Sequence, residues 1–139
     1  MRLPHRGAAL LFAMCWLAAC TPLQVGTTVP VTGQQASFVE TGLASWYGRQ
    51  HQGRRMADGA AFDMRAMIAA HRSLAFGTIV RVTNLENGRA IKVRIRDRGP
   101  YVDGRIIDLS ANAGRVLGIT REGVAKVRIE VFASDQLPS

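Results

Sequence analysis

Apolar and polar residues alternate along three stretches of this chain. A period of two predicts β-strands with one face in a core and the other face in water. The alternating stretches span residues 78–85, 90–97 and 124–132. Two shorter apolar segments, 42–47 and 105–109, also have the composition of strands. The hydrophobic pattern therefore indicates a chain built mainly from short strands.

Turn and cap residues divide these strands and mark two short helices. Asn87-Gly88 lies between two alternating runs, which predicts a β-hairpin. Ser110 is a suitable N-cap for a helix over Ala111–Leu117, and Gly118 would end that helix. Residues 62–71 contain helix formers and predict one or two further helical turns.

Together these elements predict a mainly β fold. Five or six short strands, two short helices and many turns within residues 42–133 are typical of a small closed β-barrel. A length of 139 residues fits one domain. Because a small barrel fills its interior with side chains, we expect any substrate to lie across a surface groove.

The N-terminus has the pattern of an export signal. Two arginines precede an apolar run, residues 8–19, that is too short to span a bilayer, so residues 1–19 are predicted to be a signal peptide. The sequence Leu17-Ala18-Ala19-Cys20 resembles the bacterial lipobox, which implies lipidation at Cys20; the alternative is an ordinary signal peptide with a chance cysteine. Residues 20–41 are predicted to be a flexible tether, and residues 134–139 a tail.

Charge and cysteine content narrow the partners. The formal net charge is +8, and removal of Arg2 and Arg6 with the signal leaves 8 − 2 = +6. A basic surface favours an anionic partner, and export argues for membrane headgroups or a cell-wall polymer rather than nucleic acid. Cys15 lies in the removed segment, so we expect no disulfide. No cluster has metal-ligand spacing, and we expect no metal and no cofactor.

Asp97 stands where the strand 90–97 breaks at Gly99-Pro100. Side chains presented at such a break often carry chemistry, although an aspartate there can equally cap the turn through a backbone hydrogen bond. Trp46 and Tyr47 fit either a stacking platform for sugar rings or ordinary barrel core.

Seven segments, in unbroken order, resemble the rare lipoprotein A family. They are GLASWYG (42–48), ADGAAFDM (57–64), AAH (69–71), VRVTNLENGR (80–89), IRDRGPY (95–101), GRIIDLS (104–110) and VRIEV (127–131). The resemblance implies a six-stranded double-psi β-barrel, as in expansins. It also implies an endolytic lytic transglycosylase that cleaves peptidoglycan between N-acetylmuramic acid and N-acetylglucosamine. Such enzymes prefer strands without stem peptides and leave 1,6-anhydro ends.

The resemblance also assigns a location. It implies an envelope protein that faces the periplasm and is anchored through Cys20, more readily in the outer than in the inner membrane, because Thr21 is not the retention aspartate. Many family members carry a C-terminal SPOR domain that binds peptidoglycan, and we expect none in this chain. A protein partner is not identified by the sequence.

The resemblance assigns site residues as well. Asp97 matches the family's catalytic aspartate, and His71 in AAH matches its functional histidine. His71 would contact Asp97 or a sugar; a buried histidine held by the backbone is the alternative. Arg98 joins Trp46 and Tyr47 as a substrate-binding candidate. Its charge, like that of Arg96, would oppose a general acid at Asp97 unless it points away.

Asp108 in IIDLS is a further substrate-binding candidate. It resembles the essential aspartate of the expansin motif HFDLS, and the alternative is a partner of the helix N-terminus together with Ser110.

Two positions depart from the family pattern. Ala60 stands where the family has a functional glutamate, and Met56 stands where it usually has threonine. Asp58 and Asp63 are nearby carboxylates but do not occupy the matching position. The main hypothesis is therefore a transglycosylase that works with one carboxylate. The alternatives are a non-catalytic, expansin-like peptidoglycan-binding lipoprotein, and a structural lipoprotein whose basic face binds a protein.

Overall fold

The computed structural model describes residues 35–133, which lie within one compact unit, Thr32–Ser139. The predicted signal peptide, the lipidation site Cys20, most of the predicted tether and the tail 134–139 lie outside the described residues. Within residues 35–133, no helix has both the length and the apolar character needed to cross a membrane.

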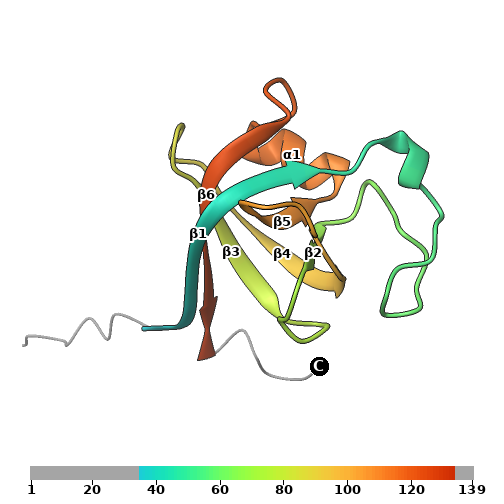
Figure 1. Ribbon diagram of the computed structural model, residues 1–139, viewed down its shortest axis with the longest axis horizontal. Coiled ribbons are helices and arrows are strands. Elements are labelled where there is room, and N and C mark those ends of the chain that lie inside the picture. The colour runs from blue at the N-terminus through green and yellow to red at the C-terminus, as the bar shows by residue number, and fades with distance from the viewer. Residues whose placement is uncertain (1–34, 134–139) are drawn as a thin grey trace, which may run out of the picture. The chain divides into compact units, whose positions relative to one another are not determined.

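Six strands close into a barrel with one helix at its side (Figure 1). The elements are β1 (Ala36–Trp46), β2 (Ile68–His71), β3 (Ile79–Asn84), β4 (Ala90–Asp97), β5 (Arg105–Leu109), α1 (Ala111–Leu117), β6 (Val124–Phe132) and the short 3-10 helix η1 (Arg49–His51). Around the barrel the order is β1-β5-β2-β4-β3-β6. The pairs β1–β5 and β2–β4 are parallel, and the other pairs are antiparallel.

The strongest local patterns are confirmed. Strands β3 and β4 form the predicted antiparallel hairpin, and Gly88 in their connection has a φ of 74°, which glycine adopts without strain. The side chain of Ser110 accepts a hydrogen bond from the Ala113 amide at 3.2 Å and caps α1. Gly118, in the left-handed conformation, ends the helix as predicted.

The prediction of helical turns over residues 62–71 is wrong. Residues Ile68–His71 form strand β2, and all four are buried between β4 and β5. A short apolar run without alternation does not distinguish a helix from a strand enclosed on both sides. The backbone hydrogen bonds offered by two neighbouring strands decide the conformation here.

The predicted boundary between tether and barrel is also too late in the chain. Strand β1 begins at Ala36 and pairs with β6 from that residue onward, so residues 36–41 belong to the barrel unit. In Figure 1 the early part of β1 lies beside the last part of β6. The pairing partner lies some ninety residues away in the sequence, where no local pattern can indicate it.

The core consists of the inward rows of the alternating strands together with α1. In β4 and β6 every second residue is buried, as the period of two requires. The fully buried large apolar side chains are Val80, Val82, Val93, Ile95, Ile107, Leu109, Leu117, Ile119, Val127, Ile129 and Val131. Because these side chains fill the interior, any ligand site of the barrel is expected on its outer surface.

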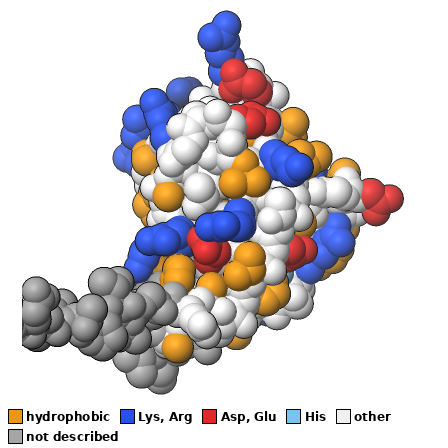
Figure 2. Space-filling view, turned by 90° about the vertical axis from the view of Figure 1, so that its left-hand side faces the viewer, with side chains coloured by type: hydrophobic (Ala, Val, Ile, Leu, Met, Phe, Trp, Pro, Cys, Tyr) orange, Lys and Arg blue, Asp and Glu red, His pale blue; other side chains and the backbone are white. Residues whose placement is uncertain are grey.

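Some basic side chains of the outward rows are paired with carboxylates. On the face in Figure 2, basic side chains are mixed with acidic and apolar ones. Arg128 pairs with Glu130 at 3.2 Å, and Arg96 pairs with Asp58 at 2.5 Å. Part of the positive charge that the sequence suggested for anionic partners is thereby neutralised within the barrel.

Candidate active site

Asp97 is the last residue of β4, and a long loop, residues 47–67, crosses in front of it. One carboxylate oxygen, Oδ1, accepts hydrogen bonds from the amides of Ala57 and Arg98, both at 2.9 Å. Within the described part of the chain, the other oxygen, Oδ2, has no hydrogen-bond partner. The turn-capping role that the sequence left open is therefore present, and it leaves half of the carboxylate available for a ligand.

The two arginines beside Asp97 point their charges elsewhere. Arg96 donates from Nε to Asp58 Oδ2 at 2.5 Å. Arg98 donates from Nη1 to the carbonyls of His71 at 3.2 Å and Leu74 at 2.7 Å. Its guanidinium also lies 3.9 Å from the ring centroid of Phe76. Neither guanidinium forms an ion pair with the Asp97 carboxylate in the described part of the chain.

The nearby carboxylates differ in how far they are engaged: Asp58 forms an ion pair with Arg96, whereas Asp63 accepts one backbone hydrogen bond. Burial opposes ionisation of Asp58, but the Ala60 amide at 2.9 Å and the Arg96 guanidinium outweigh it and lower the pKa of Asp58 below its ordinary value. Asp63 accepts a hydrogen bond from the Arg65 amide at 2.9 Å. Both carboxylates shape the loop.

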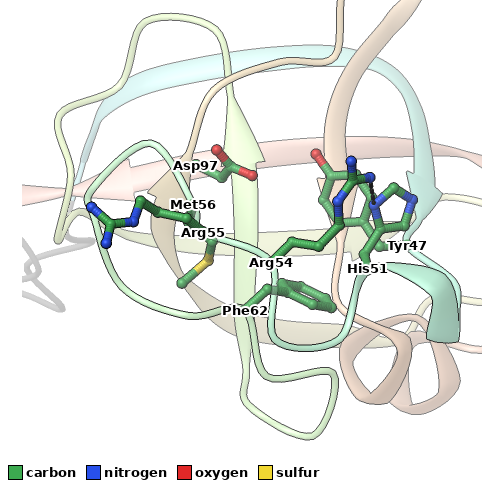
Figure 3. Close-up of a pocket in the computed structure, with 7 residues that line it drawn as sticks. All are labelled: Tyr47, His51, Arg54, Arg55, Met56, Phe62 and Asp97. Atoms are coloured by element: carbon green, nitrogen blue, oxygen red, sulfur yellow. Dashed lines mark hydrogen bonds between the residues drawn. The ribbon is translucent and has the colours of Figure 1, made fainter.

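A surface hollow of about 230 Å³ adjoins Asp97 (Figure 3). It is lined by Tyr47, His51, Arg54, Arg55, Met56, Phe62 and Asp97. Met56 and Phe62 are buried and belong to a small second apolar cluster with Ile68. The ring of Tyr47 lies 5.6 Å from Phe62 and 4.9 Å from His51. We call this feature the Asp97 hollow; it combines an aromatic floor, basic side chains and one carboxylate.

Tyr47 presents a hydroxyl that stays protonated. Burial, together with the negative charges of Asp108 and Asp97, raises the pKa of Tyr47 well above its ordinary value of 10.0. A neutral phenol can donate a hydrogen bond to a sugar oxygen. Tyr47 lines the Asp97 hollow, whereas its neighbour Trp46 packs against the main core and Gly114.

Asp108 lies beneath this site and is almost fully buried. Its Oδ1 accepts hydrogen bonds from the Ser45 hydroxyl and from Arg105, whose Nη2 is 2.6 Å away. The alternative in which Asp108 assists the helix N-terminus is not what the structure contains, because Ser110 alone caps α1. Asp108 does not line the Asp97 hollow. Its negative charge is one of the causes that raise the pKa of Tyr47.

His71 does not contact the Asp97 carboxylate. Its Nδ1 accepts hydrogen bonds from the amides of Ser73 at 3.2 Å and Leu74 at 3.1 Å. An Nδ1 that accepts leaves the proton on Nε2, which lies 3.1 Å from Glu40 Oε2. The ring is 3% exposed, so both nitrogens are already used inside the barrel.

His71 nevertheless connects to the site through its loop. It fixes the turn that supplies the carbonyl acceptors of Arg98. The next residue, Arg72, donates to the carbonyls of Pro100 at 2.5 Å, Val102 at 3.0 Å and Arg105 at 3.1 Å. The end of β2 thus braces the segment that follows Asp97. His71 has the geometry of a positioning residue.

Sequence reasoning missed several residues at this site. His51, Arg54 and Arg55 line the Asp97 hollow although they occur in a polar loop without a recognisable pattern. Tyr101 is 78% exposed, and its phenol is close enough to act electrostatically on Tyr47. Only the position of Tyr101 within IRDRGPY, four residues after Asp97, pointed toward it.

The side chain of Ala60 contributes no polar group to the site. It packs against the cluster formed by Met56, Phe62 and Ile68, and its amide fixes Asp58. Within residues 35–133, no group of three or more His, Cys, Asp or Glu side chains has an arrangement that could hold a metal ion.

A model of the lytic transglycolase family matches residues 39–129. Several curated relatives align with the same region. The endolytic peptidoglycan transglycosylase RlpA of Vibrio cholerae is 43% identical over 111 residues, which cover 80% of this chain and 42% of the relative. The RlpA of Pseudomonas aeruginosa is 41% identical over 106 residues, 76% of this chain and 31% of the relative.

A probable RlpA of Nostoc is 61% identical over 93 residues, 66% of this chain and 25% of the relative. The chain thus spans between a quarter and two fifths of the length of these three relatives.

Solved structures with the same fold include a protease inhibitor and an expansin. The Streptomyces papain inhibitor aligns with a TM-score of 0.56 and 26% identity, covering 68% of this chain and 94% of that protein. A Clavibacter michiganensis expansin aligns with a TM-score of 0.56 and 24% identity, covering 73% of this chain and 54% of the expansin. These neighbours confirm the predicted six-stranded double-psi β-barrel.

Proposed function

The chain belongs to the lytic transglycolase family, and we propose that it cleaves peptidoglycan glycan strands by transglycosylation with Asp97 as the acid/base. The bond would lie between N-acetylmuramic acid and N-acetylglucosamine, in strands without stem peptides. The observation that carries the proposal is the Asp97 carboxylate, which is held by two amides at Oδ1 and faces an open hollow.

One carboxylate suffices for this reaction. Protonated Asp97 donates its proton to the glycosidic oxygen, the bond from that oxygen to C1 of the muramic acid breaks, and the N-acetylglucosamine leaves with a hydroxyl. The Asp97 carboxylate then accepts the proton of the muramic acid's own 6-hydroxyl while that oxygen bonds to C1. A 1,6-anhydro ring forms, Asp97 regains its proton, and no water is consumed.

The surrounding residues support this role without sharing the proton transfer. Tyr47 offers a neutral hydroxyl to a sugar oxygen, because its raised pKa keeps it protonated. Arg98 and His71 both hold the turn at residues 71–74: His71 accepts hydrogen bonds from backbone amides of that turn, and Arg98 donates to two of its carbonyls. Arg98 is therefore proposed to act by positioning Asp97, since its guanidinium is already occupied by two carbonyls.

The test is product analysis with the purified full chain. Incubation with amidase-stripped glycan strands should release 1,6-anhydro-N-acetylmuramic acid ends, detected by mass spectrometry. Asp97→Asn keeps an oxygen that can accept both amide hydrogen bonds but supplies no comparable acid, so product should disappear. Asp63→Asn changes another carboxylate of the crossing loop and should leave the rate unchanged. Undiminished product from Asp97→Asn would contradict the proposal.

A second candidate function is binding without cleavage, and Ala60 is the observation that favours it. The family glutamate is replaced here by a side chain that can neither move a proton nor hold a sugar hydroxyl. In that case wild-type protein would bind purified strands and yield no anhydro ends. Product from Ala60→Glu alone would then show that this one position separates a binding barrel from an enzyme.

We also propose that the chain is anchored by lipid at Cys20 and faces the periplasm, most readily from the outer membrane. The support is the LAAC sequence after a basic and apolar leader. Metabolic labelling with an alkyne fatty acid should mark the wild-type chain in the membrane fraction. Cys20→Ser should lose the label and the membrane association; equal labelling of both would contradict the anchor.

A further inference from the structure

Two arginines of the Asp97 hollow carry positive charge that the protein does not use. Among residues 35–133, the side chain of Arg55 forms no hydrogen bond and no ion pair, and that of Arg54 forms one long contact, from Nη1 to His51 Nδ1 at 3.5 Å. Both residues are exposed. In the view of Figure 3, the Asp97 carboxylate lies between their two guanidinium groups.

Three other arginines near the site already bind groups of the protein. Arg96 binds Asp58, Arg98 binds two carbonyls, and Arg105 binds Asp108. The residues that line the hollow therefore include two arginines without an ion pair among residues 35–133 and one carboxylate, Asp97, which pairs with neither. The local charge stays positive even when Asp97 is ionised, which favours an anionic ligand.

Guanidinium groups bind carboxylates through two parallel hydrogen bonds, and these charge-assisted contacts are stronger than neutral ones. The glycan strand offers one such group. N-acetylmuramic acid carries a lactyl ether whose carboxyl is free when the stem peptide has been removed and is an amide when the peptide is attached. The charge of this one group therefore distinguishes stripped strands from peptide-bearing strands.

We propose that Arg54 and Arg55 form a carboxylate-binding subsite for the free lactyl group of a muramic acid that lies across the Asp97 hollow. This inference rests on the proposed function, because it assumes a peptidoglycan strand at Asp97. The aromatic floor of Tyr47 and Phe62 contacts the apolar side of the strand, and the guanidinium groups read its charge. An attached peptide removes that charge and adds bulk beside Asp97.

Binding measurements separate charge from bulk with three ligands. They are stripped strands, stripped strands whose carboxyl groups have been converted to primary amides with carbodiimide and ammonium, and peptide-bearing strands. The full chain carries Asp97→Asn throughout, so that the strands stay intact. The amidated strands match the stripped strands in size and lack only the charge.

We expect Arg54→Gln combined with Arg55→Gln to weaken binding of stripped strands by about tenfold or more, and to leave binding of amidated strands nearly unchanged. Arg121→Gln is the matched control, since it removes an exposed positive charge from the turn before β6, outside the hollow. The single variants show which guanidinium contributes more. Circular dichroism confirms that each variant is folded.

Two results would overturn the subsite. One is equal affinity for stripped and amidated strands in the Asp97→Asn chain that keeps both arginines. The other is a loss of affinity in Arg121→Gln as large as that in the double arginine variant, which would indicate general attraction by net charge. The outcome does not depend on catalysis. If binding depends on charge and the wild-type chain yields no anhydro product, the proposed enzyme is refuted and the subsite is kept. If the wild-type chain cleaves strands and binding does not depend on charge, the subsite is refuted and the enzyme is kept.

Discussion

Asp97 and His71 lie on adjacent strands, yet their surroundings are opposite. Ala70, the neighbour of His71, pairs with Asp97 across β2 and β4. Asp97 keeps one carboxylate oxygen free beside an open hollow. His71 is enclosed, and both of its ring nitrogens are bonded within the barrel. Successive residues of a strand point to opposite faces of the sheet. Since Ala70 pairs with Asp97, the side chain of the next residue, His71, points to the opposite face from Asp97. Asp97 therefore has an oxygen available to a ligand, whereas His71 holds together parts of the barrel.

Replacing Asp97 should produce the largest effect and should leave the fold intact. Asp97→Asn retains an acceptor for the Ala57 and Arg98 amides but loses the proton donor, so we expect the rate of anhydro-end formation to fall about 10²- to 10⁴-fold. The measurement is product mass spectrometry alongside a thermal unfolding curve. A parallel loss of Tm and activity would remove the contrast with His71.

Replacing His71 should act mainly on stability. His71→Ala leaves the Ser73 and Leu74 amides and the Glu40 carboxylate without their partner, and it opens a gap beside Phe38. We therefore expect the free energy of unfolding to fall by about 2–4 kcal/mol. Chemical denaturation measures this loss. His51→Ala, at a partly buried histidine of η1 that makes no hydrogen bond to the barrel strands, is the control and should cost clearly less stability than His71→Ala.

The kinetic consequence of His71→Ala tests its role more directly. If His71 acts by positioning, the residual activity should be lower but should keep the pH profile of the wild-type chain. A profile whose acid or alkaline limb moves would instead mean that His71 exchanges protons with the substrate. In that case the contrast between a reactive Asp97 and a purely structural His71 would be wrong.

Removing the Tyr47 hydroxyl should have a smaller effect confined to the hollow. Tyr47→Phe keeps the ring contacts with Phe62 and His51 but cannot donate to a sugar oxygen, so we expect kcat/KM to fall about tenfold with an unchanged Tm. Because the pKa of Tyr47 is raised, both proteins should respond alike to alkaline pH up to 10. Steady-state kinetics on stripped strands, at several pH values, provide the measurement.

The smallest effect concerns the pH dependence of stability. The pKa of Asp58 is lower in the folded chain than its ordinary value of 3.8, so its ion pair with Arg96 stabilises the fold above that value and is lost as the pH falls through the lowered pKa. Asp58→Asn should therefore show a weaker loss of stability between pH 5 and pH 2. If the stability of the two proteins falls identically between pH 5 and pH 2, this ion pair contributes nothing measurable to stability.

Several features follow from the sequence by itself. The β3–β4 hairpin, helix α1 with its Ser110 cap and strand β6 follow from alternation and turn chemistry, which act over a few residues. The position of Asp97 at the end of β4 follows from the same pattern and from Gly99-Pro100. The family resemblance, carried by short motifs in fixed order, is confirmed by the match over residues 39–129.

Other features were decided only when distant segments came together. Residues 68–71 form a strand because β4 and β5 enclose them, and β1 begins at Ala36 because β6 pairs with it. The separation of His71 from Asp97 depends on how β2 pairs with β4 and β5. The placement of Arg54 and Arg55 around the hollow that Asp97 also lines depends on how the crossing loop packs onto the barrel. Local propensity fixes elements with their own turn signals, whereas pairing and side-chain direction depend on contacts between residues far apart in the chain.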